Sequence, residues 1–278
     1  KRYFGRVVVA NDGTPLDIMW QEWAAKYPDV FDANISDVDM ATALMDAYDT
    51  VKASSEIVEA YDTAEMVRDI AIEIYNQFWN VAPVYCENVI IRGIRISSFG
   101  QPCGDGVDIT CCRHVLVEYV TTDCGDDNIA IKGGRNEFGY RVNRASENIV
   151  VRNSIFHSEC NGLCIGSEMS GGVENVYMER VEIGTVKNAI YFKSNKDRGG
   201  YIRRVVVDDI TVERARGAIL RFETNYFGFR GGNYPAHYTD FRISNVKAQK
   251  ADHYALFMEG NPERVIDHIS IRNFHVEQ

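Results

Sequence analysis

Apolar and polar residues alternate along most of the chain in short units that recur. In one unit Val89, Ile91, Ile94 and Ile96 are apolar, and the residues between them are polar or favour a turn. Alternation with a period of two and an enrichment in β-branched residues predict strands, and a central Asn, Gly or Asp predicts a bend. We therefore expect each unit to be two short strands joined by a tight turn.

Eight such units follow one another. The residues equivalent to Ile91 are Val67, Ile91, Val117, Val151, Met178, Val207, Ile243 and Ile271. Their unequal spacing indicates loops of different length between equivalent strands. One unit cannot bury its own apolar face, so stacking of units about 4.8 Å apart predicts an all-β, single-domain, right-handed parallel β-helix. A β-sandwich is the alternative, but it gives no reason for one motif to recur eight times.

The first part of the chain lacks the repeat. Arg6 to Ala10 reads as one strand, and Ser36 precedes apolar residues spaced as in an N-capped amphipathic helix. We expect residues 1–53 to form an N-terminal, partly helical cap over the open end of the solenoid, and residues 54–278 to form a parallel β-helix catalytic domain.

Four further short strands lie between the markers, and acidic or amide residues precede them. Aligning Ile109, Ile131, Ile165 and Phe192 places Asp105, Asp127, Asn161 and Asn188 at one stacked position, with Asp126 one residue earlier. Like charges one strand spacing apart repel, so such a stack indicates a site. Carboxyls with different pKa values can divide the tasks of general acid and water activation, as in inverting glycoside cleavage. The alternative is that Asp105 and Asp126 only cap turns.

Basic and aromatic residues follow the same strands. Lys132 and Lys193 share a second stacked column, and Arg198 comes shortly after. A cationic column beside the acids would bind an anionic sugar. Tyr226 lies in the segment 223–238, whose Tyr, Phe and Gly content suits a cleft wall that stacks on sugar rings, although an ordinary loop would fit as well. For Arg203 and Arg204 a solvated basic face is the simpler interpretation.

Composition narrows the class of partner. The net charge of −10 argues against a nucleic-acid or anionic-membrane binder. No apolar run is long enough for a membrane span, and we expect no signal peptide in this chain. The seven cysteines lie between Cys86 and Cys164 with no common zinc spacing, so we expect most of them to be small core residues. We expect neither a metal nor a cofactor.

The motifs resemble those of glycoside hydrolase family 28, the polygalacturonase family, from about Ser54 to the C terminus. Its Gly-Asp-Asp motif stands here as Gly125-Asp126-Asp127. Its Asn-Thr-Asp-Gly, Gly-His-Gly and Arg-Ile-Lys motifs correspond to Cys103-Gly104-Asp105-Gly106, Cys160-Asn161-Gly162 and Tyr191-Phe192-Lys193. The runs 78–89 and 166–172 also look like this family, the second like its bacterial and exo-acting members.

The resemblance implies roles for these residues. Asp126 would be the general acid, Asp105 and Asp127 would place and deprotonate the water, and Lys193 would hold the galacturonate carboxylate. Asn161 and Tyr191 replace the family's His and Arg. They join Lys132, Arg198 and Tyr226 as candidate substrate-binding residues, which leaves the preference for plain polygalacturonate open.

The implied protein is a secreted or periplasmic, monomeric hydrolase that cleaves galacturonic-acid linkages in pectic polysaccharide, exo-acting and inverting, without a metal. For inversion we expect the acid and base carboxyls to lie about 6.5–9.5 Å apart. One alternative is a β-helical polysaccharide lyase, which usually needs calcium and a Lys or Arg base. The other is a non-catalytic, pectin-binding solenoid.

Overall fold

A computed structural model describes residues 65–66, 71–72 and 79–277 of the chain. The expected cap at residues 1–53, its strand and helix, the boundary at residue 54 and the marker Val67 all lie outside the described residues. Within them the regular structure is almost entirely β, with one short helix, α5 (Asn136–Val142).

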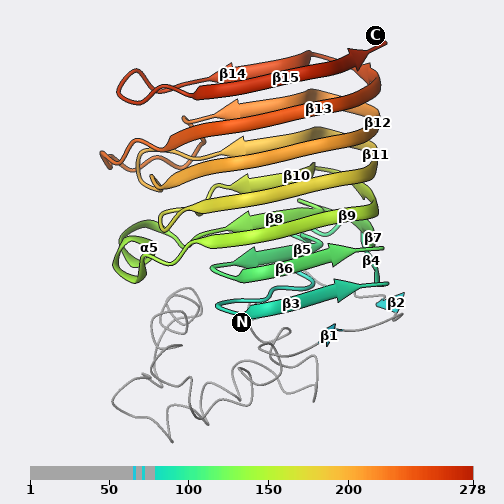
Figure 1. Cartoon of the computed structure of the whole chain (residues 1–278), viewed down its shortest axis with the longest axis horizontal. Coiled ribbons are helices and arrows are strands. Elements are labelled where there is room, and N and C mark those ends of the chain that lie inside the picture. Colours follow the sequence, from blue (N-terminus) through green and yellow to red (C-terminus); the bar gives the residue numbers. More distant parts are fainter. Residues whose placement is uncertain (1–64, 67–70, 73–78, 278) are drawn as a thin grey trace, which may run out of the picture.

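The strands stack into a three-sided solenoid (Figure 1). Face 1 holds β1 (Glu65–Met66), β3 (Glu87–Arg92), β6 (Arg113–Glu118) and the first parts of β9 (Ser146–Ser158), β11 (Val173–Lys193), β12 (Tyr201–Glu223), β13 (His237–Ala251) and β15 (Asp267–Val276). Face 2 holds β2 (Ala71–Ile72), β4 (Arg95–Ser98), β7 (Thr121–Cys124) and the next parts of β9, β11, β12, β13 and β15. Face 3 holds β5 (Val107–Thr110), β8 (Ile129–Lys132), β10 (Asn161–Gly166), the last parts of β11 and β12, and β14 (Tyr254–Glu259).

Every pairing between these strands is parallel, which rules out the β-sandwich alternative. The predicted register is confirmed for seven markers, because each residue from Ile91 to Ile271 in that series pairs with the next. The first marker was one residue off, since Met66 rather than Val67 pairs with Ile91. The wide spacing before Val151 accommodates α5, and that before Ile243 accommodates the loop at 224–236.

The corner between face 1 and face 2 has the same backbone conformation in each described coil that passes it. One residue there has a positive φ, close to +50° at Asn153, Asn245 and Asn273 and +68° at Gly93. Asn tolerates the left-handed region better than most residues, and Gly adopts it without steric cost. These corners therefore explain the Asn or Gly at the centre of four units, whereas Tyr119, Arg180 and Asp209 adopt the same positive φ in the other three.

Apolar side chains from all three faces fill the interior. The marker residues Ile91, Val117, Val151, Met178 and Val207 are at most 1% exposed. Phe192, Phe222 and Phe241 form an aromatic cluster with ring centroids 4.9–5.0 Å apart. This continuous core holds the coils in one register and so fixes how the outward-facing residues of face 3 stack.

Cysteines contribute to this core as expected. Cys86, Cys111, Cys112, Cys124 and Cys164 are buried, and no disulfide joins any of the seven. Among the described residues no helix has the length and apolar character that a membrane crossing requires.

Candidate active site

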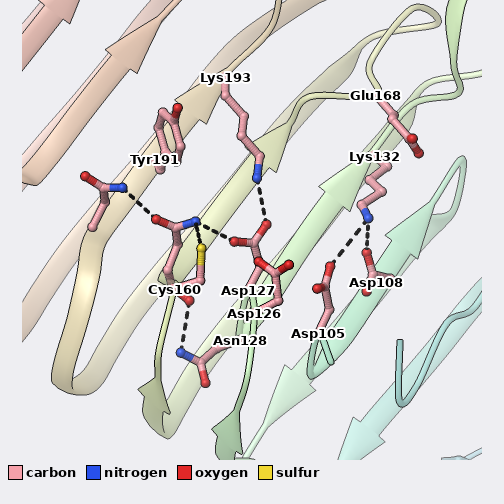
Figure 2. Close-up of polar contacts among 12 residues, drawn as sticks. Asp105, Asp108, Asp126, Asp127, Asn128, Lys132, Cys160, Glu168, Tyr191 and Lys193 are labelled. Atoms are coloured by element: carbon pink, nitrogen blue, oxygen red, sulfur yellow. Dashed lines mark hydrogen bonds and ion pairs between the residues drawn. The ribbon is translucent and has the colours of Figure 1, made fainter. Parts of the chain in front are cut away.

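The carboxylates predicted from the alignment meet on face 3 (Figure 2). Ile129 pairs with Val107 on one side and with Leu163 on the other, so Asp105, Asp127 and Asn161 occupy equivalent positions just before or at the start of their strands. Asp105 and Asp127 are buried, whereas Asp126 is half-buried. The register expected from the short strands therefore gives the observed stack.

Glycine is needed where the chain turns into the Asp126-Asp127 pair. A Cβ atom on Gly125 would lie 2.1 Å from the backbone oxygen of Gln101. No side chain can be accommodated at that distance, so the neighbouring coils approach each other only because Gly125 has none. The Gly-Asp-Asp motif thus has a steric reason as well as a chemical one.

Asp127 is held as an ion. Lys193 Nζ donates to its Oδ2 at 2.9 Å, and Asn161 Nδ2 donates to its Oδ1 at 2.6 Å. Burial alone would raise the pKa of Asp127, but Lys193 and the Asn161 amide together lower this pKa below its ordinary value. Asn188 Nδ2 in turn donates to Asn161 Oδ1 at 2.7 Å, which orients the amide. Asn161 is 2% exposed, so its amide is buried against Asp127 and does not face solvent.

A second group of charges surrounds Lys132. Its Nζ lies 3.5 Å from an oxygen of Asp105, contacts Asp108, and sits 3.5 Å from the centre of the Trp79 ring. Burial and the neighbouring Asp108 raise the pKa of Asp105 well above its ordinary value. Burial likewise raises the pKa of Asp108 to about 7, although Lys132 opposes the shift. Two carboxyls sharing one ammonium therefore retain a proton more readily than Asp127 does.

Asp108 was missed by the sequence analysis. It sits between the core residues Val107 and Ile109 of β5, so its side chain faces outward on the same face as the other acids. The available signal was an alternating strand with one Asp at an outward position, three residues after Asp105 and on the coil next to Asp126 and Asp127.

Asp126 is the carboxyl that solvent and ligands can reach. Burial and the adjacent Asp127 raise its pKa above the ordinary value, with the Cys160 thiol and the two lysines opposing. A half-buried carboxyl that keeps its proton beside an ionised one is the arrangement that general acid–base chemistry needs.

The same pair poorly suits a metal ion. One oxygen from each of Asp126 and Asp127 and the Cys160 sulfur lie within 4.8 Å of one another. Both oxygens of Asp127 already accept hydrogen bonds, and burial raises the pKa of the Cys160 thiol, so that it stays protonated at neutral pH. Metal ligands must be deprotonated and unengaged, and two of these three are not.

The remaining predicted residues form a wall along face 3 and the loops that follow it. Tyr191 is buried and donates its hydroxyl to Glu223, which also accepts from Arg221 Nε at 3.0 Å. Tyr226 is half-buried, with its ring centre 5.3 Å from Lys193 Nζ. Arg221, which the sequence analysis did not single out, pairs with Tyr191 across adjacent coils and stacks on Phe257 at 4.4 Å.

Arg198 lies in a separate cluster at the end of face 3. Arg198 and Arg135 each place a guanidinium nitrogen 3.4 Å from the same oxygen of Glu168. Two guanidinium cations share one carboxylate, so this cluster carries one net positive charge, which an anionic ligand could neutralise.

The chain has the fold of a right-handed parallel β-helix protein, and solved members of that class superpose on it. The structure of an exopolygalacturonase from Thermotoga maritima matches with a TM-score of 0.64 at 28% identity, covering 92% of this chain and 60% of that one. An endo-xylogalacturonan hydrolase from Aspergillus tubingensis matches with a TM-score of 0.51 at 19% identity, covering 84% and 65%, and supports the fold alone.

Sequence comparison places the chain more narrowly. Residues 50–277 match the model for glycosyl hydrolases family 28, so the chain belongs to that family. It is 28% identical over 201 residues to a probable polygalacturonase from Vitis vinifera, covering 70% of this chain and 40% of the relative. It is 26% identical over 145 residues to an endo-polygalacturonase from Pectobacterium parmentieri, covering 52% and 34%. The matched stretch thus covers less than half the length of either curated relative.

Proposed function

We propose that the protein is a glycosidase that cleaves galacturonic-acid linkages in pectic polysaccharide. The observation that carries this proposal is the division of pKa values among neighbouring carboxyls on face 3, where Asp126 is accessible and shifted upward while Asp127 is shifted downward. The family match and the polygalacturonase names of its relatives support the substrate class. A secreted or periplasmic location follows from that substrate.

In this mechanism Asp126 donates its proton to the glycosidic oxygen as the bond breaks, and a carboxylate on the same face activates the water. Lys193 keeps Asp127 ionised through the contact at 2.9 Å. An ammonium has three donors, so Lys193 can also hold a galacturonate carboxylate while it keeps that contact. Asn161 and Tyr191, both buried and hydrogen-bonded, act by positioning Asp127 and Glu223.

The expected inversion depends on which carboxyl activates the water. Nearest oxygens of Asp126 and Asp127 lie within 4.8 Å, shorter than the roughly 6.5–9.5 Å that leaves room for a water between acid and base. This spacing counts against inversion by that pair alone. Asp105 lies apart from the pair beside Lys132 (Figure 2). Burial and Asp108 raise the pKa of Asp105, and Lys132 opposes them by lowering it. We therefore propose that an inverting attack uses water placed by Asp105 in its ionised form, which Lys132 favours. NMR of the fresh product decides the point: retained configuration would instead make Asp127 a nucleophile.

The test of the proposal is the variant Asp126→Asn. We expect turnover of polygalacturonate to fall by about 10²–10⁴-fold, the contribution typical of a positioned general acid, with the denaturation midpoint unchanged. The matched control is Asp123→Asn, an exposed carboxyl three residues earlier, which should keep full activity.

Product analysis separates the alternatives in the same experiment. Release of single galacturonate units from chain ends would support exo attack, the mode of the similar exopolygalacturonase from Thermotoga maritima. An unsaturated product whose formation stops with a chelator would indicate a lyase. Oligogalacturonide binding without any reducing-end release would indicate a non-catalytic solenoid and would overturn the proposal.

A further inference from the structure

A cavity of about 540 Å³ lies on face 1, away from the carboxylates of face 3. Its floor is formed by outward-facing residues at the starts of β12 and β13, where Tyr201 pairs with His237 and Arg203 with Thr239. Tyr140 of α5 and Tyr234 of the loop at 224–236 form its walls. Helix α5 and the loops after β12 and β14 all project from the same side of the stack (Figure 1).

Aromatic rings in the cavity are held in place. Tyr140 and Tyr234 pack with their ring centres 4.5 Å apart, and the Tyr140 hydroxyl donates to the backbone oxygen of Asp197 at 3.2 Å. The Tyr201 ring lies against Gly172, where a Cβ atom would come within 2.2 Å of it. Fixed tyrosine rings offer apolar area at little entropic cost and present hydroxyls for hydrogen bonds, which suits the faces and hydroxyls of a sugar.

The cavity carries positive charge in a chain whose net charge is −10. Arg203 and Arg204 both contact Glu174, so one carboxylate serves two guanidiniums. Arg264 is exposed and forms no ion pair with any described residue, whereas Asp240 is the acidic residue of the lining. His237 faces Asp267 at 3.9 Å. The lining itself holds three guanidinium cations against one carboxylate, Asp240, while Glu174 and Asp267 stand outside the lining and balance the charge from there. Guanidinium groups bind carboxylates with matching geometry.

We propose that this cavity is an auxiliary binding site for a uronate-bearing oligosaccharide, separate from the site of cleavage. Tyrosine faces would pack on the sugar rings, and Arg264 with the Arg203–Arg204 pair would receive a carboxylate. The carboxylates of Glu174 and Asp240 make the cavity a poor host for a multiply charged phosphate. The tyrosine rings and guanidinium groups of the cavity indicate this class of ligand. Binding there does not require that the face 3 carboxylates cleave a glycosidic bond.

The segment 224–236 connects the two sites. Tyr226 near its start lies 5.3 Å from Lys193 Nζ, and Tyr234 near its end lines the cavity. Asp197 holds the segment by accepting hydrogen bonds from the backbone N–H of Arg230 at 2.5 Å and of Gly232 at 2.6 Å. A polymer captured at the cavity would therefore be kept near face 3, which raises its effective concentration there. We expect a trimer, with three sugar rings, to gain little from this.

The experiment is calorimetric titration of the Asp126→Asn protein with a galacturonate trimer. We expect two binding events per chain. Combining Tyr234→Ala with Arg264→Ala should remove one of them or weaken it at least about tenfold. The matched control combines Phe229→Ala with Arg230→Ala, two exposed residues of the same loop that do not line the cavity, and should change nothing. Circular dichroism and the thermal midpoint establish that each variant is folded.

Each result has a distinct meaning. Unchanged stoichiometry and affinity in the cavity variant overturn the inference, as does equal competition by inorganic phosphate or by a neutral malto-oligosaccharide. If the Asp126→Asn protein shows only one binding event and the cavity substitutions abolish it, the auxiliary site is supported and the proposed function is contradicted. In an otherwise native, active chain, the cavity substitutions should raise KM for the polymer several-fold and leave kcat and the KM for the trimer unchanged.

Discussion

The buried pair of Lys193 and Asp127 should be a main determinant of both stability and charge on face 3. The two side chains are 9% and 4% exposed, and Nζ lies 2.9 Å from Oδ2. The substitution Lys193→Met removes the cation and keeps the length of the side chain. It leaves the Asp127 carboxylate buried with the Asn161 amide as its remaining described donor.

Removing one partner of a buried ion pair costs about 3–5 kcal/mol, because an uncompensated charge stays in the interior. The size of this effect depends on pH. In the native chain the lowered pKa of Asp127 stabilises the fold above the unfolded-state value of about 3.9, and this is lost as pH falls through the lower folded-state pKa. In the variant, burial raises the pKa of Asp127, so its cost is present above that raised pKa and is relieved as pH falls.

Denaturant unfolding at a series of pH values tests this reasoning. The difference in free energy of unfolding between native and variant chains should be about 3–5 kcal/mol at pH 7. It should shrink as pH falls through the raised pKa of Asp127 in the variant, and shrink further below about pH 4 as the native contribution is lost. The control is Lys187→Met, an exposed lysine of the same strand β11, which should lie within about 0.5 kcal/mol of the native chain. A Lys193→Met difference below about 1 kcal/mol, or one that does not vary with pH, would refute the reasoning.

Two further predictions concern the same fold. Asp108→Asn should flatten the pH dependence of stability between about pH 4 and pH 7: with its pKa raised to about 7, native Asp108 makes the fold less stable as pH rises through this window. Denaturant unfolding curves at both ends of this pH window measure the change in stability. The control Asp123→Asn should keep the native pH dependence. An Asp108→Asn chain whose stability varies with pH as steeply as the native chain would contradict the raised pKa of Asp108. Phe192→Ala should lower the free energy of unfolding by about 3–5 kcal/mol, since it opens a cavity in the aromatic cluster. The control is Phe229→Ala, which is 54% exposed in a loop and should cost little; comparable losses in both would exclude the packing explanation.

The repeat could be predicted from sequence because it is a local property repeated many times. Alternation marks each strand, and Asn or Gly marks most corners between face 1 and face 2. A shift of one residue would turn a whole apolar row outward, so the register is strongly constrained. The wrong marker at Val67 shows where this reasoning stops. Ile72 pairs with Ile96 as the alignment predicted, but Met66 rather than Val67 pairs with Ile91. A weak copy of the motif does not specify how many residues separate its two strands.

The stack of Asp105, Asp127 and Asn161 followed from the same register. Sequence spacing gives the row in which a residue stands, but not the distance between charges or their exposure. Lys132 and Lys193 were predicted to bind an anionic sugar, and the structure adds that each is buried in contact with aspartates, which spacing does not give. The role of Asp108 could not be judged without knowing that it is buried and contacts Lys132.

The sequence by itself determined the solenoid, the order of its coils and the row of acids, because each depends on neighbours a fixed number of residues apart. Only the tertiary structure decided which acids are ionised and which loops enclose the cavity on face 1. Those properties depend on burial and on contacts between long loops, such as Tyr140 with Tyr234, whose separation along the chain carries no periodic signal. A pKa follows from the charges and solvent around a group, and these are set only when the coils are stacked.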